Sequence, residues 1–281
     1  MNYKVINLSE YFPMLSKAEA FEPTLTIYCH DNTKEIDPNR RRPGILICPG
    51  GGYAFTSDRE AEPVALSFLS RGYNTFVLHY SVAPERYPTA LLQASAAIAL
   101  IRQHAEEFNT DPECIAICGF SAGGHLAASL GTLWNEPFIE ETLKIKKRIN
   151  RPNAMILGYP VITSGEKAHR DTFENLLGKE ASKKIVDSMS LENRVHADVP
   201  PTFLWHTFED GAVPVENTLM FATSLKKHEI PFELHIFPEG QHGLSVCSYE
   251  SGNTNPLINP HCANWVGLCD EWLRLTFNLS K

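Results

Sequence analysis

The stretch Gly119-Phe120-Ser121-Ala122-Gly123-Gly124-His125 places one serine between glycines, at the point where an apolar segment gives way to a helical pattern. Residues 114–118 read Cys-Ile-Ala-Ile-Cys, which is typical of a buried strand, and residues 124–130 carry small side chains that suit a packed helix. Side chains two positions either side of such a serine would collide with the strand or the helix, so glycine is needed there. The spacing predicts a nucleophile elbow with Ser121 at its tip. The alternative is a tight strand-to-helix turn packed for shape alone.

Two later strand-like segments end in residues that could activate this serine. Residues 202–206 run into an acidic turn with Asp210, and residues 232–237 run into a loop with His242. Parallel strands bring their carboxyl ends to one edge of a sheet, where sites are built. We expect His242 to accept the serine proton and return it to the leaving alcohol, while Asp210 fixes the imidazole tautomer. The chain order Ser121, Asp210, His242 is the order that follows a nucleophile elbow.

Other histidines and one other acid compete for these two roles. Four histidines either lie inside predicted strands or follow the elbow into its helix, where a structural role is expected: His79, His206, His235 and His125. His242 is favoured because it combines a glycine-rich loop, a preceding strand and a position after the acid. Glu209 is the rival of Asp210, which is favoured because it stands beside Gly211 and close to Pro214, at the entry to a helix.

Three consecutive glycines follow a further buried-strand pattern at residues 44–48. The run Pro49-Gly50-Gly51-Gly52-Tyr53 lets the backbone approach a substrate with its N–H groups exposed. The amides of Gly51 and Gly52, together with that of Ala122, are predicted to form the oxyanion hole. A phosphate-cradling loop is the alternative, but neither Gly-Lys-Ser/Thr nor Gly-x-Gly-x-x-Gly follows.

These three motifs, in this order, resemble α/β-hydrolase esterases of the hormone-sensitive-lipase-like group over roughly residues 45–243. Residues 78–90 are similar to the Tyr-Arg-Leu-Ala-Pro-Glu stretch of that group, whereas Pro49 stands where its members usually carry histidine. The form of residues 49–53, with Ser57-Asp58-Arg59-Glu60 beyond it, instead resembles bacterial esterases of acetylated or feruloylated plant polysaccharides and acetylated sugars.

The resemblance implies a serine carboxylesterase that hydrolyses short-acyl, acetyl-type esters through an acyl-enzyme, with sugars or plant polysaccharide fragments as the alcohol. A small-molecule ester is therefore the expected partner. A serine peptidase of the same fold and a noncatalytic binding module on a hydrolase scaffold are the alternatives.

Strand-like and helix-like segments alternate along the chain. Residues 74–79 and 154–159 read as strands, and residues 88–108 as a long helix. This alternation predicts the α/β class: a doubly wound, mostly parallel sheet, as in the α/β-hydrolase fold, formed by residues 1–281 as a single domain. Residues 24–28 are expected to add an antiparallel edge strand.

Residues 162–199 interrupt the alternation with short helix-like pieces joined by polar turns. We expect a small helical cap rather than a second domain. Phe173, Leu176 and Leu177 either pack onto the sheet, which is the favoured interpretation, or line an acyl pocket.

Composition narrows the classes of partner and compartment. A chain of 281 residues with 43% hydrophobic content can bury a sizeable core, and a formal net charge of −8 argues against nucleic acid as a partner. No apolar segment is long enough to span a membrane and residues 1–5 begin no signal peptide, so a cytoplasmic protein without membrane association is expected.

The seven cysteines, an odd number placed mostly in apolar stretches, favour reduced thiols over a disulfide framework. The sequence has neither Cys-x-x-Cys nor His-Glu-x-x-His, so neither a metal nor a cofactor is expected.

Overall fold

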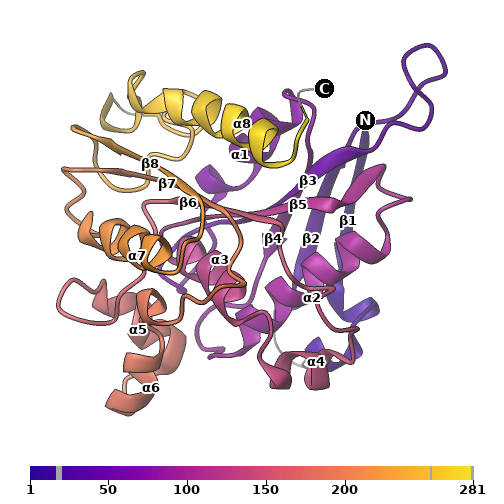
Figure 1. Ribbon diagram of the computed structural model, residues 1–281. Coiled ribbons are helices and arrows are strands. Elements are labelled where there is room, and N and C mark those ends of the chain that lie inside the picture. Colours follow the sequence, from indigo (N-terminus) through magenta and orange to yellow (C-terminus); the bar gives the residue numbers. More distant parts are fainter. Residues whose placement is uncertain (17–20, 254, 280–281) are drawn as a thin grey trace.

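The computed structural model describes residues 1–16, 21–253 and 255–279. One sheet of eight strands runs through these residues in the order β1-β2-β4-β3-β5-β6-β7-β8 (Figure 1). The strands are β1 (Asn2–Asn7), β2 (Thr24–Cys29), β3 (Arg42–Cys48), β4 (Asn74–His79), β5 (Thr110–Phe120), β6 (Ala154–Gly158), β7 (Thr202–Thr207) and β8 (Phe232–Phe237). The strands from β4 across to β8 pair in parallel. The predicted mostly parallel sheet is confirmed.

The amino-terminal edge of the sheet differs from the expectation. Residues 24–28 do form an antiparallel strand, but β2 lies inside the sheet between β1 and β4, so its prediction as the edge is wrong. The edge is β1, in which Tyr3 is 58% and Val5 is 51% exposed. Its side chains bury little, so its sequence carries no strong strand pattern, and pairing with β2 determines its conformation.

Helices cover both faces of the sheet, which makes the fold doubly wound (Figure 1). On one face lie α1 (Glu62–Leu69) and α8 (Trp265–Thr276); on the other lie α2 (Thr89–Gln103), α3 (Ser121–Leu133) and α7 (Glu216–Lys227). The helix predicted over residues 88–108 is present but ends at Gln103. The shorter helices are α4 (Pro137–Leu143), η1 (Leu8–Glu10), η2 (Pro13–Leu15), η3 (Asp58–Glu60), η5 (Asn255–Leu257) and η6 (Cys262–Asn264).

Each face of the sheet has its own apolar core. Ile98 of α2 and Leu130 of α3 belong to the larger core, while Trp205 of β7 stacks on Trp265 of α8 at 5.0 Å between ring centroids in the other. Fully burying a large apolar side chain contributes about 1.5–3 kcal/mol. The two cores hold the carboxyl ends of the parallel strands in fixed register, and the candidate site lies at those ends.

The chain between β6 and β7 contains α5 (Arg170–Leu177), α6 (Lys183–Ser188) and η4 (Leu191–Asn193). We call residues 162–199 the cap segment. Its helices α5 and α6 lie at one end of the molecule, beyond α7 and away from the strands (Figure 1).

All seven cysteines are free thiols, and six of them are buried. Burial raises the pKa of Cys29 to about 12, which keeps that thiol protonated and unreactive.

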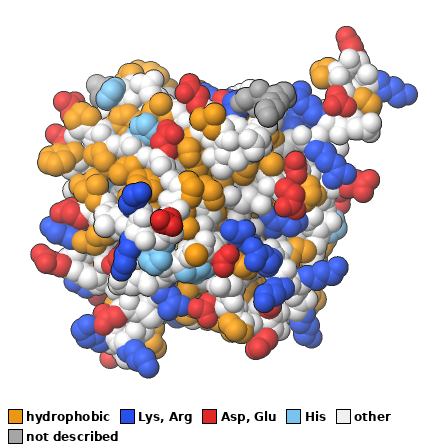
Figure 2. All heavy atoms as spheres, in the orientation of Figure 1, with side chains coloured by type: hydrophobic (Ala, Val, Ile, Leu, Met, Phe, Trp, Pro, Cys, Tyr) orange, Lys and Arg blue, Asp and Glu red, His pale blue; other side chains and the backbone are white. Residues whose placement is uncertain are grey.

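Acidic and basic side chains are interspersed over the face of the molecule in Figure 2. In the part of the chain that the structure describes, no helix combines the length and apolar character needed to cross a membrane.

Candidate active site

The turn from β5 into α3 holds Ser121 in a left-handed backbone conformation, with φ +53°. Glycine is required on both sides of it for steric reasons. A Cβ at Gly119 would lie 2.1 Å from the carbonyl oxygen of Gly123, and a Cβ at Gly123 would lie 2.1 Å from that of Cys48. The close approach of strand and helix that the motif predicts is therefore present, and it leaves the serine at the tip of the turn.

Ser121, His242 and Asp210 form a continuous hydrogen-bonded chain. His242 Nε2 lies 2.8 Å from Ser121 Oγ, and His242 Nδ1 lies 2.6 Å from Asp210 Oδ2. Because Nδ1 faces a carboxylate it carries the proton, which leaves Nε2 as the acceptor for the serine hydroxyl. Of the two acids considered, Asp210 makes this bond. The exposed carboxylate of Glu209 instead accepts a hydrogen bond from the Gly240 amide at 3.4 Å.

The Asp210 side chain is fully buried, and both of its oxygens accept hydrogen bonds. The amides of Ala212 and Val213 donate to Oδ1 at 2.9 Å each, and His206 Nε2 lies 3.2 Å from Oδ2. Burial alone raises the pKa of Asp210, but the hydrogen bonds from His206 and His242 outweigh it and hold the pKa well below its ordinary value of 3.8. Asp210 therefore stays ionised beside His242.

His206 is a second histidine on the same carboxylate. We expected a structural role for it inside a strand, and it is indeed fully buried at the end of β7. Its Nε2 faces two acceptors, the Val213 carbonyl at 3.0 Å and Asp210, so Nε2 carries the proton. Its Nδ1 lies 2.8 Å from Thr218 Oγ1, whose hydroxyl can donate to it. No sequence spacing indicates this contact, because it depends on the path of the turn after β7.

The glycine loop after β3 has the backbone that an oxyanion hole requires. Gly51 has φ +122° and Gly52 has φ +63°, both in the region that favours glycine. Among the described residues, neither amide donates a backbone hydrogen bond within the protein. The amide of Ala122 lies in the first turn of α3, where helical amides lack an intrahelical acceptor. From the cap segment, Asn175 Nδ2 donates to the Gly52 carbonyl at 2.9 Å and so fixes the loop.

A cleft of about 320 Å³ opens over Ser121 and His242. Besides the glycine loop, its walls include side chains that sequence reasoning did not assign to the site: Phe55, Arg59, His169, Asp171 and Asn175. They come from the segment after β3 and from α5 with the residue before it, two segments that only the folded chain brings together. Nothing in the local patterns marks these residues as neighbours of Ser121.

The apolar residues of the cap segment do not line this cleft. Phe173 and Leu176 are buried in the core, and the Phe173 ring packs edge-on against His125 at 5.4 Å. Burial lowers the pKa of His125 to about 4, so this imidazole is neutral near neutral pH. Its Nδ1 lies 3.1 Å from the Tyr53 hydroxyl and its Nε2 lies 3.1 Å from the Met189 carbonyl, which gives it a structural role.

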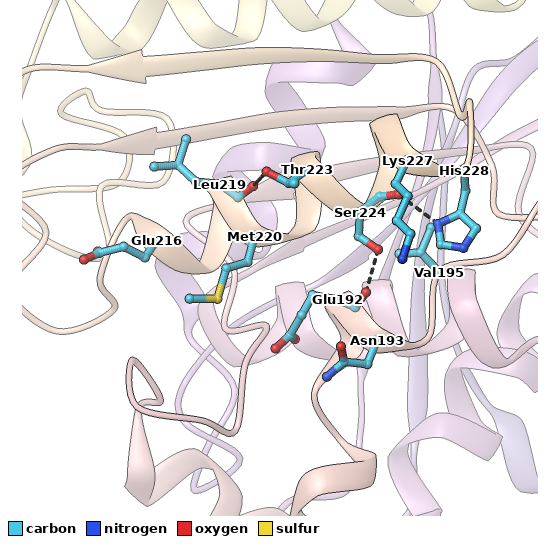
Figure 3. A pocket seen from close by; sticks show the side chains of 10 residues that line it. All are labelled: Glu192, Asn193, Val195, Glu216, Leu219, Met220, Thr223, Ser224, Lys227 and His228. Carbon is cyan, nitrogen blue, oxygen red and sulfur yellow. Dashed lines mark hydrogen bonds between the residues drawn. The ribbon is translucent and has the colours of Figure 1, made fainter.

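A larger cavity, of about 590 Å³, lies elsewhere, between α7 and η4 (Figure 3). Met220 and Lys227 of α7 face Glu192 of η4 across it, and Ser224 Oγ donates to the Glu192 carbonyl at 2.6 Å. None of the residues that line it is a candidate site residue, so the volume of a cavity does not by itself identify the candidate active site.

Comparisons with known proteins identify the family and the fold. Residues 25–225 match the model of the family described as BD-FAE. The fold of the acetyl ester-xyloside bifunctional hydrolase from Caldicellulosiruptor lactoaceticus superposes with a TM-score of 0.82 at 39% identity, covering 97% of this chain and 96% of that one.

Two curated relatives are longer than this chain. Endo-1,4-beta-xylanase B of Butyrivibrio fibrisolvens is 37% identical over 236 residues, 82% of this chain and 36% of the relative. Acetylxylan esterase of Xylanibacter ruminicola is 30% identical over 206 residues, 71% of this chain and 40% of the relative. The chain thus spans less than half the length of either. The resemblance to α/β-hydrolase esterases is confirmed, and the chain belongs to the BD-FAE family.

Proposed function

We propose that this chain is a serine carboxylesterase with Ser121 as nucleophile, His242 as general base and Asp210 as the residue that orients His242. The observation that carries the proposal is the hydrogen-bonded path from Ser121 Oγ through His242 to Asp210, at 2.8 and 2.6 Å, beneath an open cleft. Such a path converts a weakly nucleophilic hydroxyl into one that can attack a carbonyl.

The reaction follows from these positions. Ser121 Oγ attacks the ester carbonyl while its proton passes to His242 Nε2, and the amides of Gly51, Gly52 and Ala122 receive the negative oxygen. The C–O bond to the alcohol breaks, and His242 gives its proton to the leaving oxygen. Water then attacks the acyl-enzyme with the same proton transfers and releases the carboxylic acid.

The walls of the cleft favour a hydroxyl-rich alcohol with a short acyl group. Among the described residues that line it, Phe55 is the only large apolar side chain, and it is 60% exposed. Arg59, His169, Asp171 and Asn175 supply donors and acceptors for hydroxyl groups. The names of two relatives, an acetylxylan esterase and an acetyl ester-xyloside hydrolase, support the same class. We assign acetyl esters of sugars or plant polysaccharide fragments as substrates.

The test measures acetate release from acetylated xylo-oligosaccharides and from p-nitrophenyl acetate by the wild type and Ser121→Ala. The wild type should hydrolyse both, and the variant should keep only the residual contribution of binding and the oxyanion hole, on the order of 10³–10⁴ over water. Ser188→Ala, which removes a hydroxyl from α6 outside the cleft, is the control. A wild type that releases no acetate would disprove the assignment, and an active Ser121→Ala would remove Ser121 from the role of nucleophile.

A further inference from the structure

Glu60, the last residue of η3, is a buried carboxylate beside the site that the proposed reaction does not use. It is only 3% exposed. Both of its oxygens accept hydrogen bonds: the Gly50 amide donates to Oε2 at 2.8 Å, and the Tyr159 hydroxyl donates to Oε1 at 2.7 Å. Burying a carboxylate is unfavourable unless its oxygens are satisfied in this way.

The first partner is the start of the glycine loop. Gly50 directly precedes Gly51 and Gly52, and its backbone is held between Glu60 and the serine. A Cβ at Gly50 would lie 2.7 Å from Glu60 Oε2 and 2.9 Å from Ser121 Cβ. The Glu60–Gly50 bond therefore holds the start of the glycine loop beside Ser121.

The second partner leads to the loop that carries His242. Tyr159 lies just after β6, and its hydroxyl oxygen accepts a hydrogen bond from the Ser245 amide at 2.9 Å. Its ring packs edge-on against His242, with 5.0 Å between ring centroids. Since the hydroxyl accepts from Ser245, its single proton is left for Glu60. Burial, with the neighbouring Glu60 charge, raises the pKa of Tyr159 well above its usual value, so the hydroxyl remains a donor.

We propose that Glu60 is a positioning residue: through Gly50 it fixes the oxyanion loop, and through Tyr159 and Ser245 it fixes the His242 loop, both relative to Ser121. This inference rests on the proposed esterase function. Oxyanion donors act only when they lie at hydrogen-bond distance from the developing charge, and a displacement of about 1 Å can cost 10²-fold in rate.

Glu60→Gln tests the proposal at nearly constant volume. The new side-chain amide keeps one acceptor oxygen, but its NH2 group can only donate, so either the Gly50 N–H or the Tyr159 O–H is left facing a donor. We expect kcat on p-nitrophenyl acetate to fall about 10- to 100-fold while KM changes less than about threefold, because the loop acts on the transition state. Glu62→Gln is the matched control. It removes the same charge from an exposed carboxylate that bonds another tyrosine, Tyr28, at 3.1 Å outside the cleft.

Tyr159→Phe provides a second measurement should Glu60→Gln not fold. It keeps the ring against His242 but removes the hydroxyl that joins Glu60 to Ser245. Its kcat should also fall, and the double variant should lose less than the product of the two single losses, because both act in one network. Thermal unfolding of each variant separates lost activity from lost folding.

The outcomes distinguish this inference from the function on which it rests. A wild type without ester hydrolysis would overturn the proposed function. An active wild type with a folded Glu60→Gln whose kcat lies within about twofold of it would overturn only the role of Glu60, as would multiplicative losses in the double variant.

Discussion

Ser121 combines a left-handed backbone with a hydroxyl that lies beside an imidazole. Its left-handed backbone costs an L-amino acid roughly 1–2 kcal/mol, and Gly119 and Gly123 on either side of it are packed too closely to admit a Cβ. The same conformation directs Oγ to 2.8 Å from His242 Nε2. Strain of this kind persists only where the surrounding structure over-determines it, as the strand and helix on either side do here.

At this position we expect the effects of substitution on activity and stability to separate. Ser121→Ala and Ser121→Gly should both be inactive, but Ser121→Gly should be more stable by about 0.5–1 kcal/mol. Relief of the left-handed strain exceeds the entropy that glycine adds to the unfolded chain. Urea unfolding of the two variants at one pH measures this difference. An equal or lower midpoint for Ser121→Gly would mean that the turn holds Ser121 without strain.

The element α5 has two chemically distinct faces. Phe173 and Leu176 are buried in the core, whereas Asp171 and Asn175 line the cleft. Asn175 also donates to the Gly52 carbonyl, so this helix connects the cap segment to the glycine loop. Because its apolar side chains are used for packing, the helix presents polar groups to the cleft.

We therefore expect activity to be highest with acetyl to butyryl esters and to fall with longer acyl groups. Each methylene that enters an apolar pocket contributes about 0.8 kcal/mol, and the described cleft walls offer only Phe55 as a large apolar contact. The measurement is kcat/KM for p-nitrophenyl esters of increasing chain length, below their micellar concentrations. Higher kcat/KM for octanoyl than for acetyl esters would require an extended apolar pocket and contradict this expectation.

At the scale of the whole molecule, His125 joins three parts of the fold. It lies in α3, and its ring contacts Tyr53 beyond the glycine loop, Phe173 of α5 and the Met189 carbonyl of the cap segment. Burial lowers its pKa from 6.5 to about 4. As pH falls below 6.5 the unfolded chain takes up a proton on this residue, and the folded chain does not until about pH 4. Protons therefore favour the unfolded state within this range.

The wild type should lose more stability than His125→Gln as pH falls from 7 to 4.5. The substitution keeps hydrogen-bonding groups but removes the titration, and the extra loss should be on the order of 2 kcal/mol. Urea unfolding of both proteins at the two pH values tests this. The other histidines and Asp210 are present in both, so they cancel in the comparison. Parallel loss of stability in the two proteins would mean that His125 does not remain neutral in the folded state.

Strands β2 to β8 and the elbow followed from the sequence because their causes are local. Apolar runs such as residues 44–48 and 114–118 can be satisfied only by burial in a sheet, and the glycines around Ser121 are required by contacts within one turn. The order of nucleophile, acid and histidine, each after a strand, placed the three at one edge of a parallel sheet. Residues 24–28 also have a strand pattern, but that pattern does not show that β1 pairs with them on their outer side.

The rest was decided by contacts between segments far apart in the chain. Glu60 and Tyr159 are 99 residues apart yet share a hydrogen bond, and Asn175 reaches Gly52 across 123 residues. Whether His206 or Glu209 contacts the site depends on the path of one turn after β7. Such hydrogen bonds follow no periodic pattern in the sequence, since each of these polar side chains could equally well face solvent. The sequence alone determined strands β2 to β8 and the motif that bears Ser121. Only the tertiary structure decided that β1 forms the edge and which polar side chains surround Ser121, because contacts between distant segments bring them together.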